Sequence, residues 1–100
     1  MDKKKDINDI KNILSQFKPL LSEKYKIKDI GIFGSYVRGE QKETSDLDVL
    51  VEFKERVGFF KFLELEEYLG ELLHLHVDLV TKKGLKPRIG RNILNEVVMI

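Results

Sequence analysis

The chain has 100 residues, of which 42% are hydrophobic and 35% charged, and its formal net charge is +1. This composition predicts one folded domain over residues 1–100 and excludes a disordered chain. The balanced charge argues against nucleic-acid binding. Cysteine is absent, and no apolar run approaches the roughly 18 residues of a membrane span. Met1–Asp6 lacks the apolar core of a signal peptide. Together these features predict a cytoplasmic location.

Hydrophobic spacing divides the chain into alternating helices and strands. Helices are predicted where apolar residues recur every three or four positions, and strands where short β-branched runs are bounded by glycine or polar residues. Pro19 is expected to kink the first helix or break it in two, and Gly90 to interrupt the last, which starts near Pro87. In chain order the predicted elements are a helix over 7–21, a strand over 27–33, a short helix over 35–39, a strand over 47–53, a helix over 59–73, a strand over 75–81 and a helix over 85–97.

This order predicts an α/β (α+β) domain with a small mixed β-sheet flanked by helices. The segment 47–53 has a nearly continuous apolar centre, which is typical of a strand buried on both faces. The polar segment 40–45 predicts a surface loop between two strands, and Lys82-Lys83-Gly84 predicts a turn.

Three aspartates lie on or beside predicted strands. Asp46 and Asp48 are two positions apart, so their side chains point to the same face of a strand. Asp78 interrupts an apolar run, where a charge is costly unless it is paired or bound to metal. If the two strands are neighbours, the three carboxylates form a site for two Mg²⁺ ions that clamp the attacking and leaving oxygens of nucleotidyl transfer. Mn²⁺ suits the same ligands.

Each aspartate taken alone has a structural alternative. Asp46 follows Ser45 and is typical of a residue that closes a turn. Asp48 would be a surface carboxylate on a half-exposed strand, and Asp78 would pair with a nearby lysine. The combination with a Gly-Ser turn favours the metal site over these alternatives.

Gly34 and Ser35 predict a phosphate-binding turn. Gly34 has no Cβ, so a phosphate can approach the backbone, and Ser35 offers a hydroxyl donor. Free N–H groups at the start of a following helix would point at the same β- and γ-phosphates. The alternative is a simple strand-ending turn with a helix cap. Arg38 is a candidate contact of phosphate or of an aspartate, with pairing to a nearby glutamate as its alternative.

A basic cluster follows the third predicted strand. It would reach the triphosphate or an acidic partner, and the alternative is a solvated helix face. Two isolated histidines, His74 and His76, are better explained by packing or surface exposure than by zinc binding. The members of the basic cluster are Lys82, Lys83, Lys86, Arg88 and Arg91.

These motifs resemble the minimal nucleotidyltransferases, antitoxins of the DNA polymerase β-like nucleotidyltransferase superfamily. The resemblance lies first in two segments, Gly34–Glu40 and Ser45–Val51, which look like the family signature. Asp78 matches the third carboxylate of the family, and Leu85–Pro87 and Ile93–Glu96 look like its C-terminal segment. The resemblance covers nearly the whole chain and implies the polymerase β-like nucleotidyltransferase fold.

The resemblance also implies a reaction and a partner. Family members are often encoded beside a HEPN-domain ribonuclease toxin, and characterised relatives adenylylate that partner on tyrosine with ATP and Mg²⁺. For this chain it implies that Asp46 and Asp48 bind two metal ions and that Asp78 binds the catalytic one and acts as general base. Gly34 and Ser35 would then orient the triphosphate of ATP.

Two other functions stay open at the level of the sequence. One is a non-catalytic antitoxin that neutralises its partner by direct binding, and the other, weaker one is a nucleotidyltransferase of small molecules. The nucleotide base, the acceptor residue, the number of nucleotides transferred and the oligomeric state are not fixed by these residues.

Overall fold

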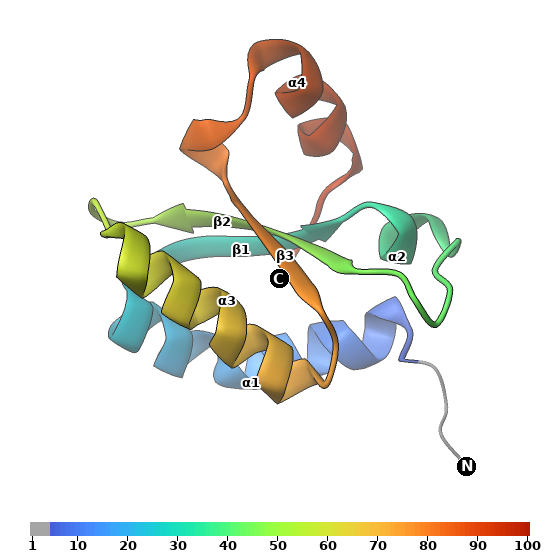
Figure 1. Ribbon diagram of the computed structural model, residues 1–100, viewed down its shortest axis with the longest axis horizontal. Helices are drawn as coiled ribbons and strands as arrows, with labels where there is room; N and C mark the ends of the chain where they lie inside the picture. Colours follow the sequence, from blue (N-terminus) through green and yellow to red (C-terminus); the bar gives the residue numbers. More distant parts are fainter. Residues whose placement is uncertain (1–4) are drawn as a thin grey trace.

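The computed structural model describes residues 5–100 and has an α+β fold with one four-stranded sheet, as the sequence predicts (Figure 1). Residues 1–4, part of the segment that was compared with a signal peptide, lie outside the described residues. No helix within residues 5–100 is long and apolar enough to cross a membrane. The elements in chain order are α1 (Ile7–Tyr25), β1 (Ile27–Phe33), α2 (Ser35–Arg38), β2 (Leu47–Phe53), α3 (Phe59–Leu73), β3 (Val77–Thr81), the 3₁₀ turn η1 (Lys82–Gly84), α4 (Pro87–Glu96) and β4 (Val98–Met99).

The sheet is mixed, with strand order β3-β2-β1-β4. β1 is antiparallel to both β2 and β4, whereas β2 and β3 are parallel. A parallel pair needs a crossover connection, and α3 provides it. At the outer edge of β3, the backbone N–H of Leu79 donates to the Glu66 carboxylate of α3 (2.8 Å), so α3 also covers a free donor of this edge strand.

One face of the sheet packs against α1 and α3, and α4 lies on the opposite side (Figure 1). Alternation along β2 turns Leu47, Val49 and Val51 toward these two helices, where all three are fully buried. The prediction that this strand is buried on both faces holds only in part, since its other face carries buried Leu50 between half-buried Asp48 and Glu52. The core residues contributed by the helices are Ile10, Leu14, Leu21, Tyr25, Leu65, Leu69 and Leu73.

The first helix runs without a break through Pro19. A capping box starts it, in which Asp9 donates its backbone N–H to Asp6 (2.9 Å) and Asp6 donates to Asp9 (3.3 Å). The predicted division into two helices is wrong because Pro19 and Ser15 are exposed, so water can donate a hydrogen bond to the Ser15 carbonyl that loses its partner. Burial of the apolar face on both sides of the proline holds the helix together.

The C-terminal part differs from the predicted elements at three places. β3 begins two residues late because Leu75 donates its N–H to the Gly70 carbonyl (3.2 Å) and so completes the end of α3. The predicted interruption at Gly90 is wrong, since this residue lies buried within α4 and donates to the Lys86 carbonyl (2.6 Å). The short strand β4 is not predicted at all. A Cβ at Gly31 of β1 would lie 2.7 Å from Val97 and 2.8 Å from Met99, so this glycine permits the close approach of β4.

Candidate active site

Gly34 forms the turn that joins β1 to α2. Its φ of +84° lies in the region that favours glycine, and a Cβ at this position would lie 2.1 Å from the Oδ2 atom of Asp48. The turn is thus in direct contact with one of the predicted metal ligands. Ser35 is the first residue of α2, which has only four residues, so the turn offers free N–H groups but no long helix dipole.

The strand register brings two of the three aspartates face to face. Asp48 of β2 and Asp78 of β3 are paired positions on the parallel strands, and Phe33, next to the Gly34 turn, is paired with Asp48 on the other side. Asp46 immediately precedes β2, two residues from Asp48. The backbone therefore gathers all three predicted carboxylates at one end of β2 and β3.

The charges of these carboxylates act on one another. Burial raises the pKa of Asp48, and the neighbouring charges of Asp78 and Asp46 raise it further, while Arg38 opposes them. Burial, followed by the charge of Asp46, also raises the pKa of the nearby Tyr36 phenol. The clustered carboxylates offer an oxygen-only donor set that suits a hard cation such as Mg²⁺.

The side chain of Asp46 is turned toward a histidine. Its Oδ1 atom lies 2.9 Å from Nδ1 of His76, and both side chains are largely exposed. Within residues 5–100, no three acidic or histidine side chains are already arranged to hold one metal ion. Joint coordination with Asp48 and Asp78 would therefore require Asp46 to rotate away from His76, a movement that its exposure permits.

Arg38 is held by two glutamates. Its Nε lies 3.0 Å from Glu40 Oε2, and its Nη1 also pairs with Glu96 of α4. Hydrogen bonds to Glu40 and then to Glu96, together with their charges, raise the pKa of Arg38 above its usual value. The structure thus shows the glutamate pairing that was the alternative for this residue, although Arg38 is near enough for its charge to affect Asp48.

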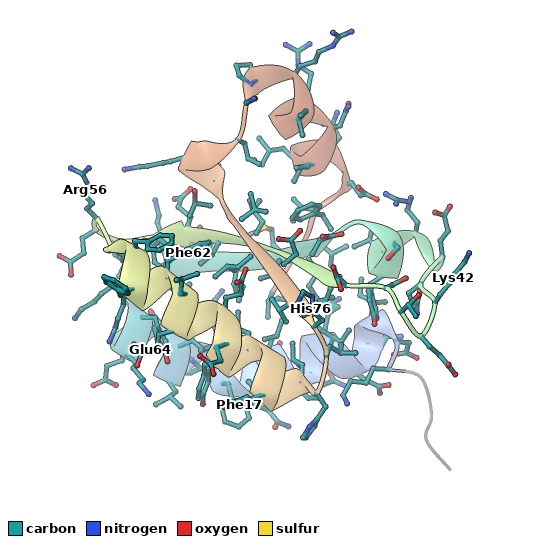
Figure 2. All side chains as sticks on the ribbon, in the orientation of Figure 1. Phe17, Lys42, Arg56, Phe62, Glu64 and His76 are labelled. Atoms are coloured by element: carbon teal, nitrogen blue, oxygen red, sulfur yellow. The ribbon has the colours of Figure 1, made fainter. Side chains whose placement is uncertain are left out.

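Sequence reasoning missed Glu96 and the role of His76 as a neighbour of Asp46. The separation of 58 residues between Arg38 and Glu96 leaves no local pattern that would pair them. His74 and His76 are both exposed, as predicted. Figure 2 shows His76 beside β3, with Lys42 toward the same end of the sheet and with Arg56 and Phe62 at the opposite end.

The predicted basic cluster lies on η1, on α4 and between them. All five side chains are exposed, and in the part of the chain that the structure describes only Lys82 is ion-paired, to Glu52 at 3.2 Å. Arg88 and Arg91 lie on α4, which is on the opposite side of the sheet from the core helices α1 and α3 (Figure 1).

Comparison with known proteins decides the family of this chain. Residues 14–100 match the nucleotidyltransferase domain. The chain belongs to this family. It is 51% identical to the protein adenylyltransferase MntA of Thermococcus cleftensis over 94% of this chain and 95% of that protein. The prediction of a nucleotidyltransferase enzyme is thereby confirmed, and the chain is an MntA-like adenylyltransferase.

Two solved structures support the same assignment. A candidate minimal nucleotidyltransferase superposes with a TM-score of 0.82 at 31% identity, covering 97% of this chain and 98% of its own. A toxin–antitoxin structure with AMP-PNP superposes with a TM-score of 0.69 at 26% identity, covering 92% of this chain and 69% of its own. The predicted nucleotidyltransferase fold is confirmed.

Proposed function

We propose that this chain is an antitoxin that transfers AMP from ATP to a tyrosine hydroxyl of a HEPN-type toxin. The observation that carries the proposal is the pairing of Asp48 with Asp78 beside the Gly34 turn, which we infer binds phosphate. The relative that is 51% identical is a protein adenylyltransferase, and the AMP-PNP structure is a toxin–antitoxin.

The carboxylates fit a pair of divalent cations. Asp46, Asp48 and Asp78 supply only oxygen donors, and their mutual repulsion, seen in the raised pKa of Asp48, would be offset by bound cations. These residues would hold two Mg²⁺ ions, with Mn²⁺ as a substitute. When bound, such ions neutralise charge on the transferred phosphoryl group and lower the pKa of the attacking hydroxyl.

The side chains of the site then have separate tasks in the transfer. Gly34 and Ser35 bind the β- and γ-phosphates and keep the pyrophosphate leaving group in line with the attacking oxygen. Asp78 accepts the proton of the tyrosine hydroxyl as general base. The tyrosine oxygen forms a bond to the α-phosphorus while the bond from that phosphorus to the bridging oxygen breaks, so pyrophosphate leaves with the electron pair. Arg38 contacts the triphosphate once it is released from its glutamates.

A labelling assay tests this function. The purified chain is mixed with the HEPN-type toxin proposed as its partner and with Mg²⁺ and ATP labelled on the α-phosphate, and intact masses are read with and without EDTA. We expect the partner to gain one or more AMP units only in the presence of metal. The Asp46→Asn/Asp48→Asn variant, which keeps the size of both side chains, should give no gain.

One observation favours a second candidate function. Asp46 is paired with His76 and the three carboxylates are not arranged as ligands, as would suit a non-catalytic antitoxin that masks its partner by binding. Coexpression of the toxin with Asp48→Asn separates the two functions. If growth is restored by this variant as well as by the wild type, masking is sufficient and AMP transfer is not the means of neutralisation.

A further inference from the structure

The charge of this molecule is divided unevenly along the chain. Residues 82–95, which we call the basic lobe, comprise η1, most of α4 and the link between them. The basic lobe holds five of the 18 basic side chains and none of the 17 acidic ones, which leaves the rest of the chain with a formal charge of −4. The net charge of +1 is therefore the sum of a positive basic lobe and a negatively charged remainder of the chain.

The basic lobe presents its charges on the outer face of α4. Gly90 is buried and Ile93 is half-buried on the inner face, whereas Arg88 and Arg91 are exposed on the outer one. These two arginines and Asn92 line a surface hollow of about 380 Å³. None of the lobe's cations beyond Lys82 has an ion-pair partner within residues 5–100, so their charge is available to a binding partner.

Aliphatic side chains border the same charges. Ile89 is 57% exposed and Leu94 is 46% exposed, both on the flanks of α4. The basic lobe contains no aromatic residue. Surfaces that bind single-stranded nucleic acid combine cations with aromatic side chains on which bases stack, so this combination of arginine and aliphatic residues favours a protein surface instead.

Both ends of the basic lobe are tied to the face of the sheet that carries the carboxylates. Lys82 pairs with Glu52, which lies on the same face of β2 as Asp48. At the other end, Glu96 follows the lobe and pairs with Arg38 of α2, next to the Gly34 turn. A partner bound to α4 would thus lie on the same side of the sheet as the carboxylates and opposite the core helices (Figure 1).

We propose that the basic lobe is the docking surface for the protein that accepts AMP, and that it binds a patch of that protein rich in Asp, Glu and aliphatic side chains. The planar guanidinium groups of Arg88 and Arg91 match carboxylates with two parallel hydrogen bonds. This contact orients the acceptor hydroxyl toward Asp78. The inference rests on the proposed transfer to a protein and adds the surface that selects that protein.

A charge reversal with a matched control tests the docking surface. Lys86→Glu/Arg88→Glu/Arg91→Glu changes the lobe, and Lys11→Glu/Lys54→Glu/Arg56→Glu changes the net charge by the same amount on α1 and at the end of the sheet opposite the site (Figure 2). The dissociation constant of the complex with the proposed HEPN-type partner is measured by calorimetry at low and high salt. We expect the lobe variant to bind at least about tenfold more weakly and to lose most of the salt dependence, and the control to bind within about twofold of the wild type.

Kinetics supply a second measurement on the same proteins. The lobe variant should show a raised KM for the acceptor, with kcat and the KM for ATP within about twofold of the wild type. Thermal shift with AMP-PNP checks that each variant is folded. Should the triple reversal fail to fold, Arg88→Gln/Arg91→Gln changes only the two exposed arginines and is expected to weaken the complex by about threefold or more.

The outcomes separate this inference from the proposed function. If the lobe variant and the wild type bind the partner with equal affinity, the docking surface is overturned. A larger loss of affinity in the matched control than in the lobe variant also overturns it. Loss of binding to a 20-nucleotide RNA, without loss of binding to the protein, would assign the lobe to nucleic acid instead. A complex that depends on the lobe but carries no AMP would overturn the transfer and leave the docking surface standing. Absence of any complex would overturn the docking surface.

Discussion

The two faces of the sheet use the same strands for different purposes. On β2, Leu47, Val49 and Val51 are fully buried under α1 and α3, while Asp48 and Glu52 remain partly exposed on the other face. The first face gains its free energy from the removal of apolar surface from water. The second face holds Asp48, whose pKa is raised by burial and then by the charges of Asp78 and Asp46.

This difference between the two faces indicates that the core positions the site without taking part in its chemistry. Burial of one face fixes the register of β2 against β3, because a slip of one residue would turn every core side chain to the wrong side. That register places Asp48 opposite Asp78. A substitution on the core face should therefore lower stability and spare catalysis, and a substitution on the site face should do the reverse.

The largest expected effect is the loss of catalysis in Asp48→Asn. Removal of one ligand charge should lower the rate of AMP transfer by at least about a thousandfold, equivalent to about 4 kcal/mol of transition-state stabilisation. The rate is measured with α-labelled ATP and saturating partner. Transfer within about tenfold of the wild type would remove Asp48 from the metal site.

The stability of the same variant should change in the opposite sense. The pKa of Asp48 is raised in the folded protein, so its contribution to stability is fully present below the ordinary value of 3.8 and is lost as the pH rises through the folded pKa. Asparagine does not titrate. In buffer with EDTA, the melting temperature of Asp48→Asn relative to the wild type should therefore rise between about pH 4 and pH 7. A constant difference across this range would contradict the pKa shift.

Leu69→Ala tests the contribution of the core face to stability. Leu69 of α3 is fully buried against the sheet, and loss of its side chain leaves a cavity that should lower the free energy of unfolding by about 2–5 kcal/mol. Denaturant unfolding gives this value. Transfer per folded molecule, measured at a temperature where the variant is folded, should stay within about threefold of the wild type. A loss of kcat comparable to that of Asp48→Asn would show that the two faces are not independent.

Gly34→Ala tests the boundary between the faces. An added Cβ would meet Asp48 at 2.1 Å and would have to accept a φ of +84°, so the turn and the carboxylate must both shift. We expect a destabilisation of about 1–3 kcal/mol, measured by urea unfolding, and a fall in AMP-PNP affinity. The matched control is Gly39→Ala, where φ is also positive at +70° but no atom lies within 4 Å of the added Cβ. If both variants bind AMP-PNP equally well, the contact with Asp48 has no part in holding the nucleotide.

Local patterns were sufficient to predict the main helices and strands of the two faces. Three- and four-residue spacing predicts α1 and α3, and the β-branched runs predict β1 and β2, because these elements bury residues in the periods of helix and strand. The sequence was sufficient to predict that Asp48 and Asp78 belong to one site, because each is a charged residue within an otherwise apolar strand. Their proximity depends on the parallel pairing of β2 with β3, which is seen only in the structure.

The features that sequence missed depend on contacts between distant segments. Pro19 fails to divide α1 because tertiary burial outweighs the lost hydrogen bond, and β4 is only two residues long, too short for any periodicity. Its one signal is Gly31, a glycine within a strand, which is a known mark of close backbone approach. The link of Arg38 to Glu96 also spans the chain and has no local pattern.

The smallest expected effect concerns this link. Glu96→Gln removes one of the two charges that hold Arg38, and because the Arg38 side chain is about half exposed to solvent the free energy of unfolding should fall by only about 0.2–1 kcal/mol. If Arg38 contacts the triphosphate, its partial release should lower the KM for ATP by about twofold to fivefold, and Arg38→Gln should raise it. Initial rates at varied ATP and fixed partner measure both changes.

Glu40→Gln provides the comparison for Glu96→Gln, since it removes the other charge on Arg38 without altering α4. A lowered KM in both glutamate variants would mean that Arg38 is shared between its glutamates and the nucleotide. A change confined to Glu96→Gln would instead point to the position of α4, because only Glu96 joins that helix to α2. An unchanged KM for ATP in all three variants would limit Arg38 to an ion pair that fastens α4 beside the site face, and the phosphate contact proposed for it would be wrong.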